Sequence, residues 1–213
     1  MPYHHGDLAN ALTAAAVELA RTGGPEAVVL REAARRVGVS ATSAYRHFER
    51  RGGLIHTVKE LALVELAARM QDELTASRPV ADPPADALRR LRTLGAGYIR
   101  FALAEPGLFR TAFSRSDPPG TESKPMSVLD TRSFHMLAEK LNALVDCGWI
   151  PPDRRPYLKL AAWSTVHGMA GLLLELDGPL RHLPKAEQEA AIQRALDLVI
   201  DGVAGVRWGA RRQ

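Results

Sequence analysis

Cysteine is almost absent from this sequence of 213 residues, which contains only Cys147. A lone cysteine can form no intrachain disulfide and cannot build a cysteine-based metal site, as is typical of proteins in a reducing cytoplasm. Long apolar runs are absent too, because the longest uncharged run, 160–174, is too short for a bilayer and contains polar residues. The first residues, MPYHHGDLANALTAAA, also lack the pattern of a secretory signal. We therefore expect a cytoplasmic protein that does not enter the membrane.

Signatures of common enzymes are missing as well. The sequence contains no nucleophile elbow, no phosphate-binding loop and no dinucleotide fingerprint. Ser164 and His167 have the residue types of a nucleophile and a base, but no orienting carboxylate or oxyanion loop accompanies them. The adjacent His4 and His5 lack further ligands at a spacing that would support a metal site. We predict no enzymatic activity, no cofactor and no metal.

Composition indicates a globular protein with a basic surface. Apolar residues make up 46% of the chain, which is enough to bury a core. The formal net charge of +4 and the isoelectric point near 9.5 suit a polyanionic partner. Many proteins without such a partner are mildly basic too, so the charge supports this interpretation without deciding it.

The stretch 29–53, VLREAARRVGVSATSAYRHFERRGG, predicts two short helices around a tight turn, a helix-turn-helix. The first helix has one apolar stripe, made of Leu30, Ala33, Ala34 and Val37. Gly38 is expected to end it, because glycine adopts the left-handed conformation without a Cβ clash. Ser40 is a suitable N-cap for the second helix, in which Ala44 and Phe48 lie on the side that must pack.

A preceding amphipathic helix completes a three-helix domain. Its apolar face is made of Leu8, Leu12, Ala15, Ala16 and Leu19. Such a domain can hold the second helix-turn-helix member outward, where its remaining polar, aromatic and cationic side chains suit a DNA groove. Helix pairs of this kind also occur in all-helical proteins that bind no DNA, so the pattern alone leaves simple packing open.

These motifs resemble the tetracycline-repressor-type (TetR/AcrR) family of transcriptional regulators. The resemblance rests on HHGDL at 4–8, LREAARRVGVS at 30–40 and AYRHF at 44–48, followed by Gly53 and Leu54, where the fourth helix of the family begins. It implies an all-α fold with an N-terminal helix-turn-helix DNA-binding domain (1–53) and a connecting helix (54–76). A C-terminal helical bundle for ligand binding and dimerisation (77–213) follows.

The resemblance also implies a set of DNA-binding residues, namely Leu30, Arg31, Ser40, Ala41, Thr42, Ser43, Tyr45, Arg46, His47 and Arg51. The family commonly caps its second helix with Ser or Thr, whereas this chain has Val29. We therefore expect the backbone amides of Leu30 and Arg31, rather than a capping side chain, to meet a phosphate. Arg50 and Arg51 either clamp a phosphate or form a solvated basic turn.

Beyond a proline-rich boundary at 77–86, helical periodicity continues. Helices are expected near 88–101, 108–113, 126–148, 154–176 and 185–206. The arginines outside the apolar stripe of the first of these are most simply a solvated face. The last two helices carry more apolar surface than a small domain can cover, which favours a homodimer in which they pair with their copies. A purely monomeric core is the alternative.

The motif Trp163-Ser-Thr-Val-His167-Gly168 resembles a Trp-x-x-x-His-Gly signature of one branch of the family. Two interpretations are open: a packed tryptophan with a hydrogen-bonded core histidine, or a pocket wall with one polar anchor. The candidate ligand-binding residues are Phe101, Phe109, Phe113, Met136, Trp149, Trp163 and His167.

The resemblance thus implies a homodimeric repressor that binds a palindromic double-stranded DNA operator and is released by a small hydrophobic effector of unknown identity. An all-helical small-molecule-binding protein, or an enzyme without DNA binding, is the alternative. A helical adaptor that binds only protein would leave Tyr45, Arg46 and His47 unexplained. Steep loss of DNA affinity with rising salt would separate these classes.

Overall fold

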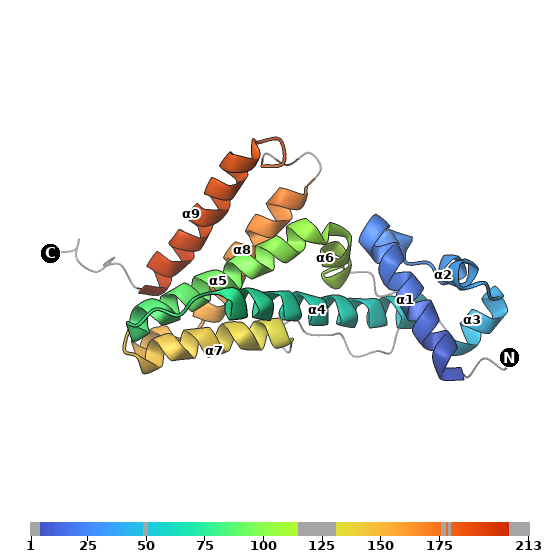
Figure 1. Cartoon of the computed structure of the whole chain (residues 1–213), viewed down its shortest axis with the longest axis horizontal. Coiled ribbons are helices and arrows are strands. Elements are labelled where there is room, and N and C mark those ends of the chain that lie inside the picture. Colours follow the sequence, from blue (N-terminus) through green and yellow to red (C-terminus); the bar gives the residue numbers. More distant parts are fainter. Residues whose placement is uncertain (1–4, 49–50, 115–130, 176–177, 179, 205–213) are drawn as a thin grey trace. The chain divides into compact units, whose positions relative to one another are not determined.

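A computed structural model describes residues 5–48, 51–114, 131–175, 178 and 180–204, and within these ranges all regular secondary structure is helical (Figure 1). The predicted all-α class is therefore confirmed. The elements are α1 (His5–Gly23), η1 (Pro25–Ala27), α2 (Leu30–Val37), α3 (Ala41–His47), α4 (Arg51–Ala76), α5 (Pro83–Ala104), α6 (Pro106–Ala112), α7 (Arg132–Asp146), η3 (Pro152–Arg154), α8 (Leu158–Leu174) and α9 (Lys185–Ala204).

The chain forms two compact units. Unit 1 comprises Met1–Glu65 and Ala104–Met126, and unit 2 comprises Leu66–Leu103 and Ser127–Gln213. The boundary falls inside α4, so the first part of this helix belongs to unit 1 and its last part to unit 2. Unit 1 also includes α6, which lies far from the other helices of this unit in the sequence.

In unit 1, α1 packs against α2, α3 and α6. The buried face of α1 consists of Leu8, Leu12, Ala16, Leu19 and Ala20. This is the predicted apolar stripe with one exchange, since Ala15 is only half-buried and Ala20 is fully buried. The stripe allows α1 to support both members of the helix-turn-helix.

Local residue chemistry fixes the turn between α2 and α3 as predicted. Gly38 has a φ of 78°, so it ends α2 in the left-handed conformation. The Oγ atom of Ser40 accepts a hydrogen bond from the backbone N–H of Ser43 at 3.1 Å and thereby caps α3. Val29 precedes α2 without a side-chain cap. The turn therefore has one glycine stop and one serine start.

The start of α6 lies directly on the end of α1. A Cβ atom at Gly107 would lie 2.1 Å from the carbonyl oxygen of Ala20 and 2.3 Å from that of Arg21. The Arg21 guanidinium binds the carboxylates of Glu65 at 2.9 Å and Glu105 at 2.6 Å. Burial opposes the charge of Arg21, but these hydrogen bonds raise its pKa above the usual value. One cation thus joins α1, α4 and the residue before α6.

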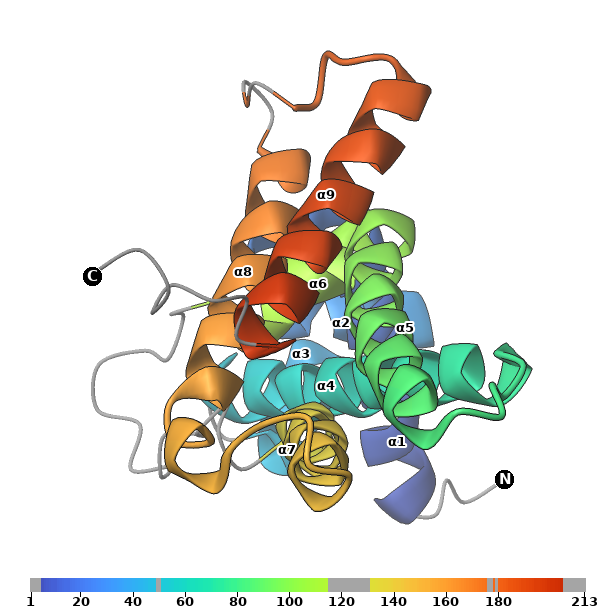
Figure 2. The same ribbon diagram turned by 90° about the vertical axis from the view of Figure 1, so that its left-hand side faces the viewer.

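In unit 2, α8 packs against both α7 and α9. Figures 1 and 2 show α8 and α9 side by side. The helix α8 contributes Ala162, Val166, Ala170 and Leu173 to the core. These residues recur every three or four positions, so one face of α8 is covered within the unit.

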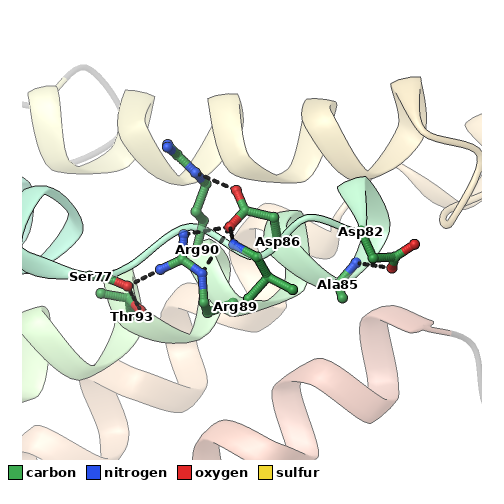
Figure 3. A network of polar contacts seen from close by, with 8 residues as sticks. Ser77, Asp82, Ala85, Asp86, Arg89, Arg90 and Thr93 are labelled. Atoms are coloured by element: carbon green, nitrogen blue, oxygen red, sulfur yellow. Dashed lines mark hydrogen bonds and ion pairs between the residues drawn. The ribbon is translucent and has the colours of Figure 1, made fainter.

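The proline-rich boundary is shorter than predicted, because α5 begins at Pro83. Proline suits the first turn of a helix, where its missing N–H removes no hydrogen bond. Asp82 caps this turn by accepting from the N–H of Ala85 at 3.0 Å. Figure 3 shows Arg89 and Arg90 directed at Asp86, which both arginines bind. The N–H of Val80 and these arginines lower the pKa of Asp86 to about 2.

The start of α8 also differs from the prediction. Tyr157 has a φ of 67°, and this left-handed residue separates the short η3 turn from α8, which begins at Leu158 instead of near Arg154. The predicted start of α7 near Met126 and the predicted end of α9 near Val206 lie outside the described residues.

The contact of α6 with α1 predicts the effect of Gly107→Ala. The added methyl group would overlap two backbone oxygens, so the free energy of unfolding should fall by about 1–3 kcal/mol, the usual cost of overpacking. Gly202→Ala in α9 is the control, because no atom lies within 4 Å of its Cβ position. This second change should stabilise the protein by about 0.5–1 kcal/mol. Urea denaturation measures both values, and equal effects would show that α6 does not contact α1 this closely.

Candidate functional site

The exposed face of α3 is the first candidate site. Ala44 is 0% exposed and faces the core of unit 1, whereas Tyr45 is 42% exposed. Thr42 and Arg46 are exposed as well. One aromatic hydroxyl, one small hydroxyl and one guanidinium therefore point away from the core on a helix of seven residues. All three groups can bind phosphates or base edges.

The other predicted DNA-binding residues have several environments. Ala41, Ser43 and His47 are half-buried on α3, and Arg31 is exposed in the first turn of α2. The side chain of Leu30 is 2% exposed and belongs to the core, so only its backbone amide can serve a ligand. Ser40 acts as the cap described above. Arg51 is the first residue of α4, and its side chain lies outside the described residues.

Positive charge near this face is only partly compensated. Glu32 binds Arg35 at 2.7 Å and Arg36 at 3.4 Å, and the hydrogen bond from Arg35 is the main cause that lowers the pKa of Glu32 to about 2. No ion pair within the described residues includes Arg31 or Arg46. Two outward-facing cations, Arg31 on α2 and Arg46 on α3, therefore have no carboxylate partner among the described residues.

The second candidate site is a cavity inside unit 2, bounded by α4, α5, α7, α8 and α9. The centre of a water molecule can move within about 30 Å³ of it. Its wall is almost entirely apolar and includes Leu91, Leu94, Leu137, Val166, Leu196 and Val199. Arg92, Tyr98, Ser133 and Trp163 supply its polar groups. An apolar space with a few polar groups in its wall is a candidate small-molecule site.

Two residues of the cavity wall, Tyr98 and Trp163, form a cluster with His167. The Tyr98 hydroxyl lies 2.8 Å from Nδ1 of His167. The Trp163 indole is stacked on the His167 ring, with a centroid distance of 4.7 Å and an interplanar angle of 17°. Burial raises the pKa of Tyr98, while a hydrogen bond from Trp163 opposes this rise. Burial also lowers the pKa of His167, which favours its neutral form.

A charged group also lines the cavity. The guanidinium of Arg92 binds the carboxylate of Asp197 and the side-chain oxygen of Gln193, the latter at 2.6 Å. These contacts join α5 to α9. The sequence suggested that the arginines of α5 form a solvated face, but Arg92 is instead paired across two helices.

The cavity includes one of the seven predicted ligand-binding residues, Trp163. His167 lies next to it through Tyr98. The others lie elsewhere: Phe101 and Met136 are buried in unit 2, Phe109 and Phe113 belong to unit 1, and Trp149 is largely exposed. Sequence reasoning missed Arg92 as a wall residue and assigned Tyr98 only to the core. The helical spacing of Leu91, Leu94 and Tyr98 was the signal in the sequence that could have indicated a shared wall on α5.

The described residues contain neither a candidate metal cluster nor a candidate membrane span. No three His, Cys, Asp or Glu side chains there gather closely enough to hold a metal ion. None of the helices in these ranges combines the length and the apolar character that crossing a bilayer requires.

The buried environment of His167 predicts a pH dependence of stability. Its lowered pKa means that the unfolded chain binds a proton at pH values where the folded ring stays neutral, so stability must fall as the pH drops below about 6.5. His167→Gln should reduce this fall, whereas His135→Gln, on the exposed side of α7, should leave it unchanged. Urea denaturation at several pH values measures the slopes. Identical slopes in all three proteins would contradict the prediction.

Family comparisons cover both units. Residues 12–58 match the family described as bacterial regulatory proteins, tetR family, and residues 91–199 match the family described as tetracyclin repressor-like, C-terminal domain. No curated protein matches the chain.

Solved structures share the fold along nearly the whole chain. A protein of unknown function from Rhodococcus sp. RHA1 is 25% identical, with a TM-score of 0.70, and the match covers 96% of this chain and 99% of that one. A putative tetR family transcription regulator from Shewanella sp. PV-4 is 16% identical, with a TM-score of 0.64 and coverage of 92% and 97%. A TetR variant from Acinetobacter baumannii AYE in complex with minocycline is 20% identical, with a TM-score of 0.61 and coverage of 96% and 98%.

Proposed function

Because the chain belongs to the tetR family of bacterial regulatory proteins, we propose that it is a cytoplasmic transcriptional repressor. It binds a palindromic DNA operator as a homodimer and leaves the operator when a small hydrophobic effector enters unit 2. The observation that carries this proposal is the outward face of α3. Tyr45 and Arg46 are exposed there, although Ala44, the residue just before them, is fully buried.

In the proposed complex, α3 lies in the major groove. Arg46 and Thr42 read base edges, since a guanidinium can bind guanine with two hydrogen bonds and a hydroxyl can donate or accept. Tyr45 and Arg51 contact the sugar-phosphate backbone and fix the position of the helix. The first backbone amides that bond inside α2 are those of Glu32 and Ala33, both to the Val29 carbonyl. The amides of Leu30 and Arg31 precede them and face a phosphate at the helix N-terminus.

The dimer forms through α8 and α9, and each helix supports this with an exposed surface. On α8, one exposed stripe consists of Ala161, Thr165, Gly168 and Leu172. No atom lies within 4 Å of a Cβ position at Gly168, so a helix from a second copy can approach its backbone closely. On α9, Leu198 is 63% exposed. Pairing of both helices with their copies would bury these apolar groups in a four-helix interface.

The effector acts through α4 in this proposal. Met70 of α4 lines the cavity, and the same helix continues into unit 1, which contains α3. A ligand that favours one position of α4 changes the spacing of the two α3 helices in the dimer, and the operator then fits less well. A coupling free energy of about 1–3 kcal/mol suffices for such a switch.

Substitutions on α3 and at the start of α4 test the DNA interface. Tyr45→Ala and Arg51→Ala should weaken binding to all duplexes, because both remove backbone contacts. Arg46→Ala should cost about 1–3 kcal/mol at the operator and relax the preference at one base pair, and changes at Thr42 should also alter the preferred sequence. Fluorescence anisotropy with a duplex selected from a random pool measures affinity, and repeated selection measures preference.

Arg35→Ala is the matched control for these variants, because Arg35 pairs with Glu32 on α2. It should change operator affinity less than any of them. Unchanged affinity in Tyr45→Ala would place the DNA-reading surface elsewhere. Failure of the unaltered protein to bind any duplex at low salt would refute the proposed function.

The dimer interface is tested by Gly168→Leu. A leucine there would hold the two α8 helices apart, so the protein should sediment as a monomer and lose affinity for a palindromic duplex. Ala68→Leu, on the exposed side of α4, is the control and should remain dimeric. Sedimentation velocity separates the two species. If Gly168→Leu stayed fully dimeric, this face of α8 would not be the interface.

A further inference from the structure

The polar groups around the cavity of unit 2 all have partners within the protein, and this has a consequence for the ligand. We propose that the cavity selects uncharged apolar molecules and excludes anions, and that Asp197 sets this selectivity by occupying the guanidinium of Arg92. The inference rests on the proposed function only in calling the ligand the effector. The cavity and its selectivity can be tested without DNA.

The two members of the cluster that line the cavity, Tyr98 and Trp163, already have hydrogen-bond partners. Tyr98 has one proton to donate, and Nδ1 of His167 lies 2.8 Å from its oxygen. The indole of Trp163 can only donate, so its hydrogen bond with Tyr98 is accepted by the same hydroxyl oxygen. The Tyr98 hydroxyl is thus hydrogen-bonded both to Nδ1 of His167 and to the indole N–H of Trp163. A ligand hydroxyl or carboxylate would have to replace one of these bonds.

Ser133 is engaged as well. Its hydroxyl lies 3.0 Å from that of Thr131, and both residues are buried. Among the described residues, no buried side-chain nitrogen or oxygen lacks a hydrogen-bond partner. A ligand therefore gains no unpaired donor or acceptor in this wall, while its own polar groups would lose their water. Loss of water without a new hydrogen bond is unfavourable, so the wall favours an apolar ligand.

Arg92 is the group that could attract an anion, and its charge is already compensated. Asp197 binds it directly, and Gln193 accepts a second hydrogen bond at 2.6 Å. The amide nitrogen of Gln193 donates to Glu189, which fixes the Gln193 oxygen toward Arg92. A carboxylate that entered here and displaced Asp197 would leave the Asp197 charge unpaired. A carboxylate that lay beside Asp197 would be repelled by it. A cation would find the Asp197 carboxylate already bound to Arg92.

The Arg92–Asp197 pair is too exposed to contribute much to stability. The side chain of Arg92 is 33% exposed and that of Asp197 is 52% exposed. Exposed ion pairs contribute little to folding, so Asp197 can be neutralised without loss of the fold. Its effect on an anion near Arg92 is direct, because both would bind the same guanidinium. Asp197 is thus a specificity-determining residue for the cavity.

Three fluorinated probes of nearly equal size test the charge preference. They are 4-fluorotoluene, which is neutral, 4-fluorobenzoate, which is an anion, and 4-fluorobenzylammonium, which is a cation. Fluorine NMR of each probe with the full-length protein gives its dissociation constant. We expect 4-fluorotoluene to bind at least about tenfold more tightly than either charged probe, because the apolar wall offers a charge no partner. Equal binding of 4-fluorobenzoate, or no binding of 4-fluorotoluene, would overturn the inference.

Asp197→Asn tests the role assigned to this residue. With the carboxylate gone, Arg92 can bind 4-fluorobenzoate, whose affinity should rise about threefold or more while that of 4-fluorotoluene stays within about twofold. Asp201→Asn removes the same charge one turn further along α9 and should change neither affinity. If both variants bound 4-fluorobenzoate equally, the effect would be one of net charge and Asp197 would have no special role.

A cavity-filling variant shows where the probe binds. Val199 lines the cavity from α9, and Val199→Phe should abolish binding of 4-fluorotoluene, whereas Val64→Phe, at an exposed valine of α4 outside the cavity, should retain it. Retention in Val199→Phe would place the probe elsewhere and refute the site. If Val199→Phe does not fold, the comparison of the three probes on the unaltered protein still decides the charge preference.

These measurements separate the inference from the proposed function. Binding of 4-fluorotoluene by a protein that binds no duplex would refute the proposed function and leave the cavity inference intact. Operator binding by a protein that binds none of the three probes would refute the cavity inference and leave the proposed DNA binding intact.

Discussion

The burial of Ala44 is the constraint on which the candidate DNA interface depends. Helix α3 has only seven residues, and its packing against α1 and α2 places this small side chain in the core. Once one side of so short a helix is fixed, the side chains of Thr42, Tyr45 and Arg46 must face outward. A larger residue at position 44 would push α3 away from its support, and the outward face would lose its fixed orientation.

Much of unit 1 was predictable because its signals are local. Gly38 and Ser40 end and start their helices through interactions with residues at most four positions away, and such interactions can be recognised in a sequence. Helix starts that depend on a backbone conformation without a residue signature were placed wrongly. Tyr157 is such a case, since a non-glycine residue in the left-handed region delays the start of α8.

The cavity was harder to predict because its wall combines distant segments. Trp163 was found through a motif, but Arg92 acquires its role only through Asp197, which lies 105 positions away. Aromatic content was a poor guide: Phe109 and Phe113 pack on each other within unit 1, with ring centroids 4.9 Å apart. A sequence shows which side chains are apolar, but only the fold shows which of them face a common space.

Compensation of charge distinguishes the two candidate sites. On α2 and α3, Arg31 and Arg46 have no carboxylate partner among the described residues, and uncompensated cations on a surface attract a polyanion at long range. Around the cavity, Arg92 is paired with Asp197, and an apolar wall with compensated charge favours a neutral molecule. Because one surface favours a polyanion and the other a neutral molecule, a neutral effector of the kind proposed would not compete with DNA for the same cations. In the proposed function, the influence of such an effector on DNA binding would therefore be conformational.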